Sequence, residues 1–193
     1  MYDYIKGHIT QLTPTYIVVD NNGIGYLMHI SLSTFSKLKE GEPVQMYVHH
    51  VIREDANDLF GFFDVKEREI FRQLITVSGV GANTARMVLS SLTADEVVVA
   101  ITSGDVKLLK GVKGIGEKSA QRMIIDLKDK LGRPGDISEL FVKKDNTSRQ
   151  EALSALVMLG FAKATIEKVI DKIASENPTA TVEQLVKISL KRL

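Results

Sequence analysis

The sequence of 193 residues contains no cysteine, no long apolar run and no obvious leader. Without cysteine the chain can form no disulfide, thiolate metal site or thiol nucleophile. No apolar stretch approaches the roughly 18 residues that a membrane-spanning helix needs. The first residues, MYDYIKGHIT, lack the basic-then-apolar order of a signal peptide. We therefore expect a cytoplasmic protein with no membrane segment.

Net charge is also nearly absent, with 25 Lys and Arg against 24 Asp and Glu. The distribution is less even than the total. Residues 1–63 hold four basic and seven acidic side chains, whereas residues 64–133 hold twelve basic and nine acidic ones. An acidic first third followed by a basic middle part indicates segments with separate roles.

Residues 4–62 have the composition of β-strands. β-branched and aromatic residues at 16–19 and 24–30 flank the pair Asn22-Gly23, a strong hairpin-turn signal. The pattern predicts about five strands in this part of the chain. Because closing a small sheet removes its exposed edges, we expect an antiparallel barrel over residues 1–63. An OB-like barrel is the first choice and an SH3-like barrel the alternative.

From residue 64 the apolar positions recur at helical spacing, which predicts an all-α segment over residues 64–131. The run Val97–Ile101 has the propensity of a strand. Its flanking residues, Thr93 before and Gly104 after, favour a short capped helix instead.

The remainder of the chain divides into a linker and a small helical domain. Residues 132–149 are rich in Pro, Gly, Asp, Asn and Ser, which predicts a flexible linker carrying one apolar patch, Leu140-Phe141-Val142. Residues 150–193 return to helical spacing and predict three short helices. A domain of that size is marginal alone, so it is expected to meet a partner.

The helical segment contains an internal repeat. Residues 77–85 (VSGVGANTA) match residues 112–120 (VKGIGEKSA). A repeat of this kind indicates two copies of one supersecondary unit. Each copy predicts a helix, a Gly-x-Gly turn that uses positive φ, and a second helix. The apolar middle residues, Val80 and Ile115, are expected to be buried between the two helices.

The start of each second helix offers the chemistry of a phosphate site. Unpaired backbone N–H groups and the positive end of the helix dipole favour an anion there. In the second copy Lys118 and Arg122 lie four residues apart on one helical face. The first copy has Asn83 and Met87 at those positions, so it is expected to rely on backbone amides. Neither turn is followed by the GKS or GKT of a P-loop.

This paired unit resembles the helix-hairpin-helix motif of DNA-binding proteins without sequence specificity. The whole chain resembles the RuvA family, the Holliday-junction-binding subunits of bacterial branch-migration complexes. The resemblance rests on VIREDA and LFGF within residues 51–62, the two glycine turns, and LVMLGF at residues 156–161. It implies a multidomain α+β chain: an OB-like barrel, a tandem helix-hairpin-helix domain and a C-terminal UBA-like three-helix domain.

The resemblance also implies a homotetramer, one or two of which cover a four-way DNA junction and hold it open and square. The residues expected to bind DNA are Gly79, Gly81, Asn83, Thr84, Gly114, Gly116, Lys118, Ser119 and Arg122. Glu54 and Asp55 would form an acidic pin at the centre that keeps the exchanging strands apart. Asn83 departs from the basic residue common in the family, which weakens the expected phosphate contact of the first hairpin.

Further partners follow from the same resemblance. The C-terminal domain, residues 150–193, would dock on RuvB, the hexameric ATPase that drives branch migration. The candidate contact residues are Leu156, Leu159, Ile170 and Ile173. The junction resolvase RuvC would be another partner. The chain itself is expected to have no catalytic site, no metal and no cofactor.

The main alternative is a DNA repair enzyme, because helix-hairpin-helix modules also occur in glycosylases and structure-specific nucleases. A glycosylase needs a catalytic Asp, often with a Lys, and Asp126 and Lys128 follow the second turn. A nuclease needs clustered carboxylates for Mg²⁺, which Glu54, Asp55 and Asp58 could supply. A third alternative is an adaptor that binds proteins and no DNA.

Overall fold

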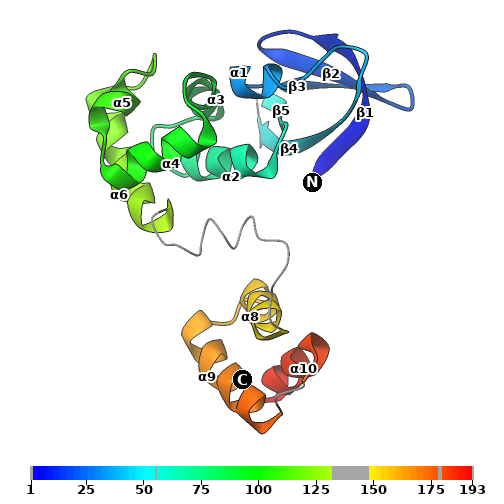
Figure 1. Ribbon diagram of the computed structural model, residues 1–193, viewed down its shortest axis with the longest axis vertical. Helices are drawn as coiled ribbons and strands as arrows, with labels where there is room; N and C mark the ends of the chain where they lie inside the picture. Colours follow the sequence, from blue (N-terminus) through cyan, green and yellow to red (C-terminus); the bar gives the residue numbers. More distant parts are fainter. Residues whose placement is uncertain (1, 55, 132–147, 178–179, 193) are drawn as a thin grey trace. The chain divides into compact units, whose positions relative to one another are not determined.

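The computed structural model describes residues 2–54, 56–131, 148–177 and 180–192 (Figure 1). Contacts within the chain form two compact units, Met1–Phe141 and Val142–Leu193. Within the described ranges, the first unit contains a β-barrel followed by helices, and the second contains three helices. Among the described residues, no helix has the length and apolar character needed to cross a bilayer.

Five strands close into a barrel in the order β1-β2-β3-β5-β4. Their bounds are β1 (Tyr4–Leu12), β2 (Tyr16–Asn21), β3 (Ile24–His29), β4 (Pro43–Arg53) and β5 (Ala56–Phe62). All neighbours are antiparallel except β3 and β5, which are parallel where His29 pairs with Phe60. Because β5 lies between β3 and β4 and closes the barrel in parallel, the arrangement is OB-like, as predicted, and the SH3-like alternative is not favoured.

The strand predictions follow from local pattern. Asn21 pairs with Ile24, which confirms the hairpin at Asn22-Gly23. Alternate residues of β2 point inward, so Ile17 and Val19 are fully buried. A short helix, α1 (Leu32–Phe35), follows β3; its N-cap is Ser31, whose side chain accepts a hydrogen bond from the Thr34 N–H.

The helical part of the first unit continues directly from β5. Its helices are α2 (Val65–Leu74), α3 (Ala82–Ser91), α4 (Ala94–Ser103), α5 (Val106–Lys110) and α6 (Glu117–Leu131). The prediction of a capped helix for Val97–Ile101 is confirmed, because this run lies within α4. Thr93 and Glu96 form a capping box at its start, and Gly104 ends it.

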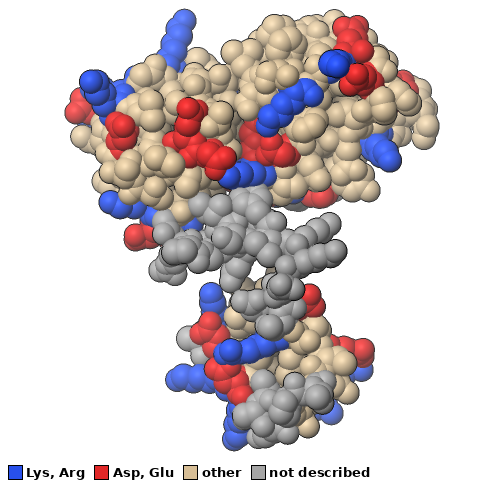
Figure 2. All heavy atoms as spheres, in the orientation of Figure 1, with Lys and Arg blue, Asp and Glu red and all other residues tan. Residues whose placement is uncertain are grey.

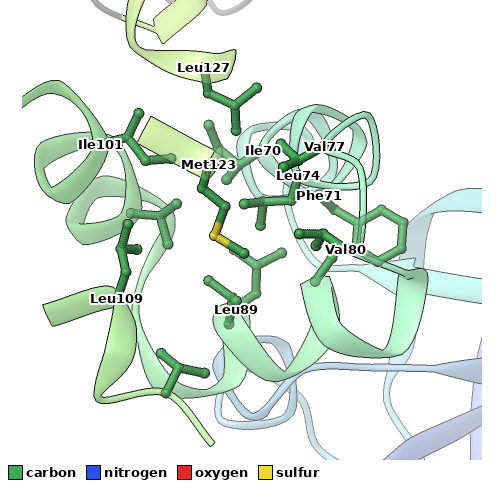
Figure 3. Close-up of a cluster of buried hydrophobic side chains, with 14 of the residues drawn as sticks. Ile70, Phe71, Leu74, Val77, Val80, Leu89, Ile101, Leu109, Met123 and Leu127 are labelled. Carbon is green, nitrogen blue, oxygen red and sulfur yellow. The ribbon is translucent and has the colours of Figure 1, made fainter. Parts of the chain in front are cut away.

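The barrel has a hydrophobic core of its own, which includes Ile17, Val19 and Met46, and it also contributes to a second core shared with the helices. Phe60 and Phe62 of β5 belong to the same buried cluster as the apolar faces of α2 to α6. Their rings lie 5.1 and 4.9 Å from the ring of Phe71 on α2. Figure 3 shows Met123 of α6 projecting toward the middle of this cluster. The shared core explains why contacts group residues of the barrel and the helices into one unit.

A buried carboxylate joins α1 to α2 at the edge of this core. The Glu67 side chain is 2% exposed and accepts hydrogen bonds from the Ser31 hydroxyl and, at 2.8 Å, from the Thr34 hydroxyl. Thr34 in turn accepts a hydrogen bond from the Phe63 N–H at 3.1 Å. Burial raises the pKa of the Glu67 carboxyl, and the hydrogen bonds from Ser31 and Thr34 act in the opposite direction.

The second unit is a three-helix domain. It consists of α8 (Ser148–Met158), α9 (Lys163–Glu176) and α10 (Val182–Arg192). A capping box precedes α10, since the Thr181 N–H donates to the Gln184 side chain and the Gln184 N–H donates to the Thr181 hydroxyl. The core of the domain contains Ala152, Leu156, Ile166, Ile170, Ile173 and Leu185. The apolar patch Leu140-Phe141-Val142 lies outside the described residues.

The Glu67 contact predicts a defined pH dependence. Because the folded pKa is raised above the ordinary 4.5, the contribution of Glu67 to stability is fully present below that pH. It is lost as the pH rises through the raised pKa. Glu67→Gln should remove this dependence, so the difference in unfolding free energy, wild type minus variant, should fall from pH 4 to pH 7.

Urea unfolding of both proteins at several pH values measures that difference. The neighbouring Asp64 contributes in the opposite direction. Although burial acts to raise its pKa, hydrogen bonds from Lys37 and the Glu67 N–H hold the pKa below its usual range. Asp64 is present in both proteins and therefore largely cancels. A difference that rises with pH would contradict the assignment to Glu67.

Candidate nucleic-acid interface

The two copies of the sequence repeat form turns with the same backbone hydrogen bonds. The Val80 N–H donates to the Val77 carbonyl at 3.0 Å, and the Ile115 N–H donates to the Val112 carbonyl at the same distance. Val80 and Ile115 are 4% and 6% exposed. The prediction that these middle residues are buried is therefore confirmed, and both belong to the shared core of the first unit.

The two glycines of each turn have different roles. Gly79 and Gly114 have φ of 88° and 90°, so the predicted positive φ is found at the first glycine of each pair. Gly81 has φ of −83°, a value open to any residue, and a Cβ added to it would meet nothing within 4 Å. The protein itself does not require glycine there. What the missing side chain provides is an open backbone at the start of α3.

Hydrogen-bond donors gather at each helix start. Gly81 is the N-cap of α3 and has no side chain to accept from the first amides of the helix. Asn83 is exposed and Thr84 is half-buried just inside α3; Lys118 and Ser119 occupy the same places in α6. Each hairpin thus brings together bare backbone, free helix-start amides and a hydroxyl, which suits one phosphate group.

The hairpins differ in charge. Lys118 and Arg122 of α6 are exposed, and within the described part of the chain neither has an acidic partner. Arg122 Nη1 lies 3.4 Å from the carbonyl oxygen of Ser78, which belongs to the turn of the first hairpin. This contact places the two hairpins side by side. The counterparts in α3 are Asn83 and Met87, so positive charge belongs mainly to the second hairpin.

The carboxylate at the start of α6 is paired with a lysine. Glu117, the first residue of α6, pairs with Lys110 at 2.8 Å, and the hydrogen bond from that lysine lowers the pKa of Glu117. The pairing reduces the repulsion that a carboxylate at the helix start would exert on phosphate. On the face of the first unit seen in Figure 2, acidic and basic side chains are interspersed, so charge alone does not mark the site.

The predicted acidic pin lies at the tip of a β-hairpin. Arg53 at the end of β4 pairs with Ala56 at the start of β5, and Glu54 between them is exposed. Asp55, the other predicted pin residue, lies outside the described residues. The hairpin belongs to the barrel, whereas both glycine turns belong to the helical part of the same unit.

The four predicted partner-binding residues differ in their exposure to solvent. Leu156, Ile170 and Ile173 are at most 1% exposed and form the core of the three-helix domain. Only Leu159 is available, at 60% exposed. It belongs to an exposed apolar patch that consists of Val157, Met158, Leu159 and Phe161.

Sequence reasoning missed three members of that patch. Helical spacing identifies apolar positions but does not indicate which of them remain exposed to solvent in a small domain. The signal that could have found them is their number, because apolar residues fill every position but one from Leu156 to Phe161. A helix has only one buried face, so such a run must expose some of its members.

The residues of the enzyme alternative do not form an evident reaction site. Asp126 and Lys128 are both exposed on α6. Within the described residues, no group of three or more His, Asp or Glu could hold a metal ion. Asp55, part of the proposed carboxylate cluster, is not among the residues covered by that statement.

Comparison with known proteins follows the same order along the chain. Family models match three segments: the RuvA N terminal domain at residues 1–61, a SAM-like Helix-hairpin-helix tandem at 71–129, and the RuvA C-terminal domain at 147–193. A relative from Christiangramia forsetii is 50% identical over all of both chains. Relatives from Flavobacterium psychrophilum and Bacteroides thetaiotaomicron are 45% identical, again over both full lengths. Each is named Holliday junction branch migration complex subunit RuvA.

The glycine geometry predicts a contrast between two neighbouring substitutions. Gly79→Ala places a Cβ on a left-handed residue and should lower the unfolding free energy by about 1–2 kcal/mol. Gly81→Ala needs no change of backbone and should cost less. Urea unfolding of both variants measures the difference. Equal losses at the two positions would mean that the turn does not depend on the positive φ of Gly79.

Proposed function

Because the chain belongs to the RuvA family, we propose that it binds four-way (Holliday) DNA junctions as the non-catalytic subunit of a branch-migration complex. The observation that carries the proposal is the pair of matched glycine turns. Both open a helix with bare backbone, and Arg122 brings them side by side. Two adjacent phosphate sites fit the two strands of one duplex arm.

Contacts of this kind grip DNA without reading its sequence. Backbone amides, hydroxyls and lysines bind phosphates, and phosphates are alike at every base pair. A protein that works on migrating junctions must accept every sequence that passes through it. The hairpins therefore supply affinity for an arm, and selectivity for a junction has to come from the way several arms are held together.

Four-fold assembly would supply that selectivity. In the proposed homotetramer each subunit holds one arm. The four β4–β5 hairpins, which carry Glu54 and Asp55, meet at the crossover. At physiological salt the Debye length is about 8 Å, so these carboxylates repel only phosphates that come close to them. They would disfavour a continuous duplex across the centre and keep the exchanging strands parted. The exposed Glu54 at the tip of its hairpin supports this role.

The three-helix domain is proposed to dock on RuvB, whose ATPase drives branch migration. The patch of Val157, Met158, Leu159 and Phe161 is the surface that favours this contact, because exposed apolar side chains at a helix end suit burial against a partner. RuvC, as a resolvase of the same junctions, is proposed as a further partner on the resemblance alone. A cytoplasmic location fits both partners.

A binding titration tests the proposal. A synthetic four-way junction and a linear duplex with the same arm sequences are titrated at one stated salt concentration, with Mg²⁺ present. We expect tighter binding to the junction and no cleavage of either DNA. Equal affinity for the two DNAs would contradict junction selectivity, and cleavage would favour the repair-enzyme alternative.

The same titration with Lys118→Ala/Arg122→Ala tests the hairpins. Affinity should fall for both DNAs and for every sequence. The slope of log affinity against log salt should become shallower by about one for each phosphate that the variant no longer neutralises. Lys6→Ala/Lys128→Ala removes equal charge from exposed positions on β1 and in the last turns of α6, away from the two glycine turns, and should change the slope little. A variant that binds like the wild type would favour the adaptor alternative.

In the three-helix domain, we expect docking on RuvB and folding to depend on different residues. Met158→Ser/Leu159→Ser should weaken binding to RuvB while thermal unfolding and junction affinity stay as in the wild type. Leu156→Ala is the contrasting variant, because truncating a buried core leucine costs about 2–5 kcal/mol and should unfold this small domain. Circular dichroism and calorimetric titration with RuvB measure the two effects. Unchanged RuvB binding in the surface variant would exclude the patch as the docking site.

A further inference from the structure

Helix α3 connects the first glycine turn to the barrel. It begins at Gly81 beside the turn, and one turn further on Arg86 Nη1 donates to the carbonyls of Thr15 and Ile30, at 3.1 and 3.3 Å. Near the end of the helix, the Ser90 hydroxyl accepts a hydrogen bond from the Leu32 N–H at 3.1 Å. The helix that offers its start to a phosphate is therefore fixed to the barrel by its other half.

We propose that Arg86 and Ser90 are positioning residues for junction selectivity, which hold the hairpins at the angle to the acidic pin that a four-way junction requires. The inference rests on the proposed function and deepens it. Neither side chain needs to touch DNA in this role. They fix the position of the helical part relative to the barrel. The helical part binds a DNA arm, and the barrel carries Glu54.

The barrel side of the shared core packs on α2. Phe60 and Phe62 of β5 lie against Phe71, and Tyr47 and Val51 of β4 pack against the same cluster. Arg68 of α2 also donates to the Asp3 carbonyl at 2.8 Å and to the Asp3 carboxylate at 2.6 Å. The segment from Ile30 to Thr34 provides the second attachment, because it bonds to Glu67 of α2 through Thr34 and to Ser90 of α3 through Leu32.

Arginine suits this second attachment. Its planar guanidinium keeps the two carbonyl oxygens at fixed directions, which a flexible lysine does less well. The Arg86 side chain is half-buried, and within the described residues it has no acidic partner that could draw it elsewhere. Its Nε is buried without a hydrogen bond. Ser90 adds a link to the same helix, since its hydroxyl donates to the Arg86 carbonyl at 2.8 Å.

Linear duplex and junction place different demands on this geometry. A linear duplex can engage the hairpins without placing its strands around the pin. A junction engages the hairpins while its open centre surrounds the pin, so its binding requires the barrel and the helices to be aligned. If the α3 attachment is loosened, the entropic cost of restoring the alignment falls on junction binding alone. The ratio of the two affinities therefore reports on positioning.

The test compares Arg86→Met with Lys128→Met, a matched loss of one charge at an exposed site on α6. Junction and duplex affinities are measured for both at the same salt. For Arg86→Met we expect junction affinity to fall about tenfold, a change of about 1.4 kcal/mol, and duplex affinity to stay within about twofold. Arg86→Lys should restore part of the ratio. Lys128→Met should leave it unchanged.

Equal losses for junction and duplex would overturn the inference, since they would reflect charge or folding rather than alignment. Ser90→Ala provides a milder second variant in case Arg86→Met folds poorly. It should lower the ratio in the same direction, and an unchanged ratio in this variant would also overturn the proposal.

A distance measurement separates this inference from the proposed function. The chain has no cysteine, so Gln45→Cys on β4 and Gln121→Cys on α6 allow spin labels at two chosen exposed sites. Arg86→Met should broaden the distance distribution without DNA; an unchanged distribution would overturn the inference. If the wild type does not prefer junctions but Arg86→Met still broadens the distance distribution, the proposed function is refuted and the rigid attachment is established.

Discussion

The positive φ at Gly79 and Gly114 is the constraint on which the proposed interface depends. A left-handed residue reverses the chain within one step, so the next residue, Val80 or Ile115, can enter the core while the following backbone stays outside. The buried middle residue anchors the turn, and the exposed backbone opens a helix. The same step therefore contributes to the core and forms the proposed anion site, so the stability of the turn and its proposed binding role depend on the same residues.

Local pattern was sufficient to predict the hairpins and the barrel. Each glycine turn is formed by residues that are adjacent in sequence, and the same pattern occurs twice in the chain, so it can be recognised from sequence alone. The barrel follows from strands whose alternation is visible along the chain and whose hairpin at Asn22-Gly23 is a local signal. The different use of the two glycines was not visible, because φ at Gly81 depends on the fold rather than on residue type.

Contacts between distant segments could not be predicted in this way. Ser31 and Glu67 are 36 residues apart, and Arg86 reaches Thr15 across 71. Nothing near either residue indicates its partner, and each alone would pass for a surface side chain of an amphipathic helix. The same limit applies to the tail, where Leu156 and Leu159 look alike in sequence but one is buried in the domain core and the other is exposed to solvent.

In the proposed function, affinity and selectivity therefore have different structural origins. The proposed source of affinity is the groups that the sequence repeats, which any duplex satisfies. Shape selectivity cannot come from those groups, because every arm presents the same phosphates to them. We propose that it comes from the distance and angle between the glycine turns and the acidic pin, which side chains away from the DNA hold fixed. A buried carboxylate and an arginine bonded to carbonyls suit that task, since directional hydrogen bonds restrict rotation where an apolar contact permits sliding.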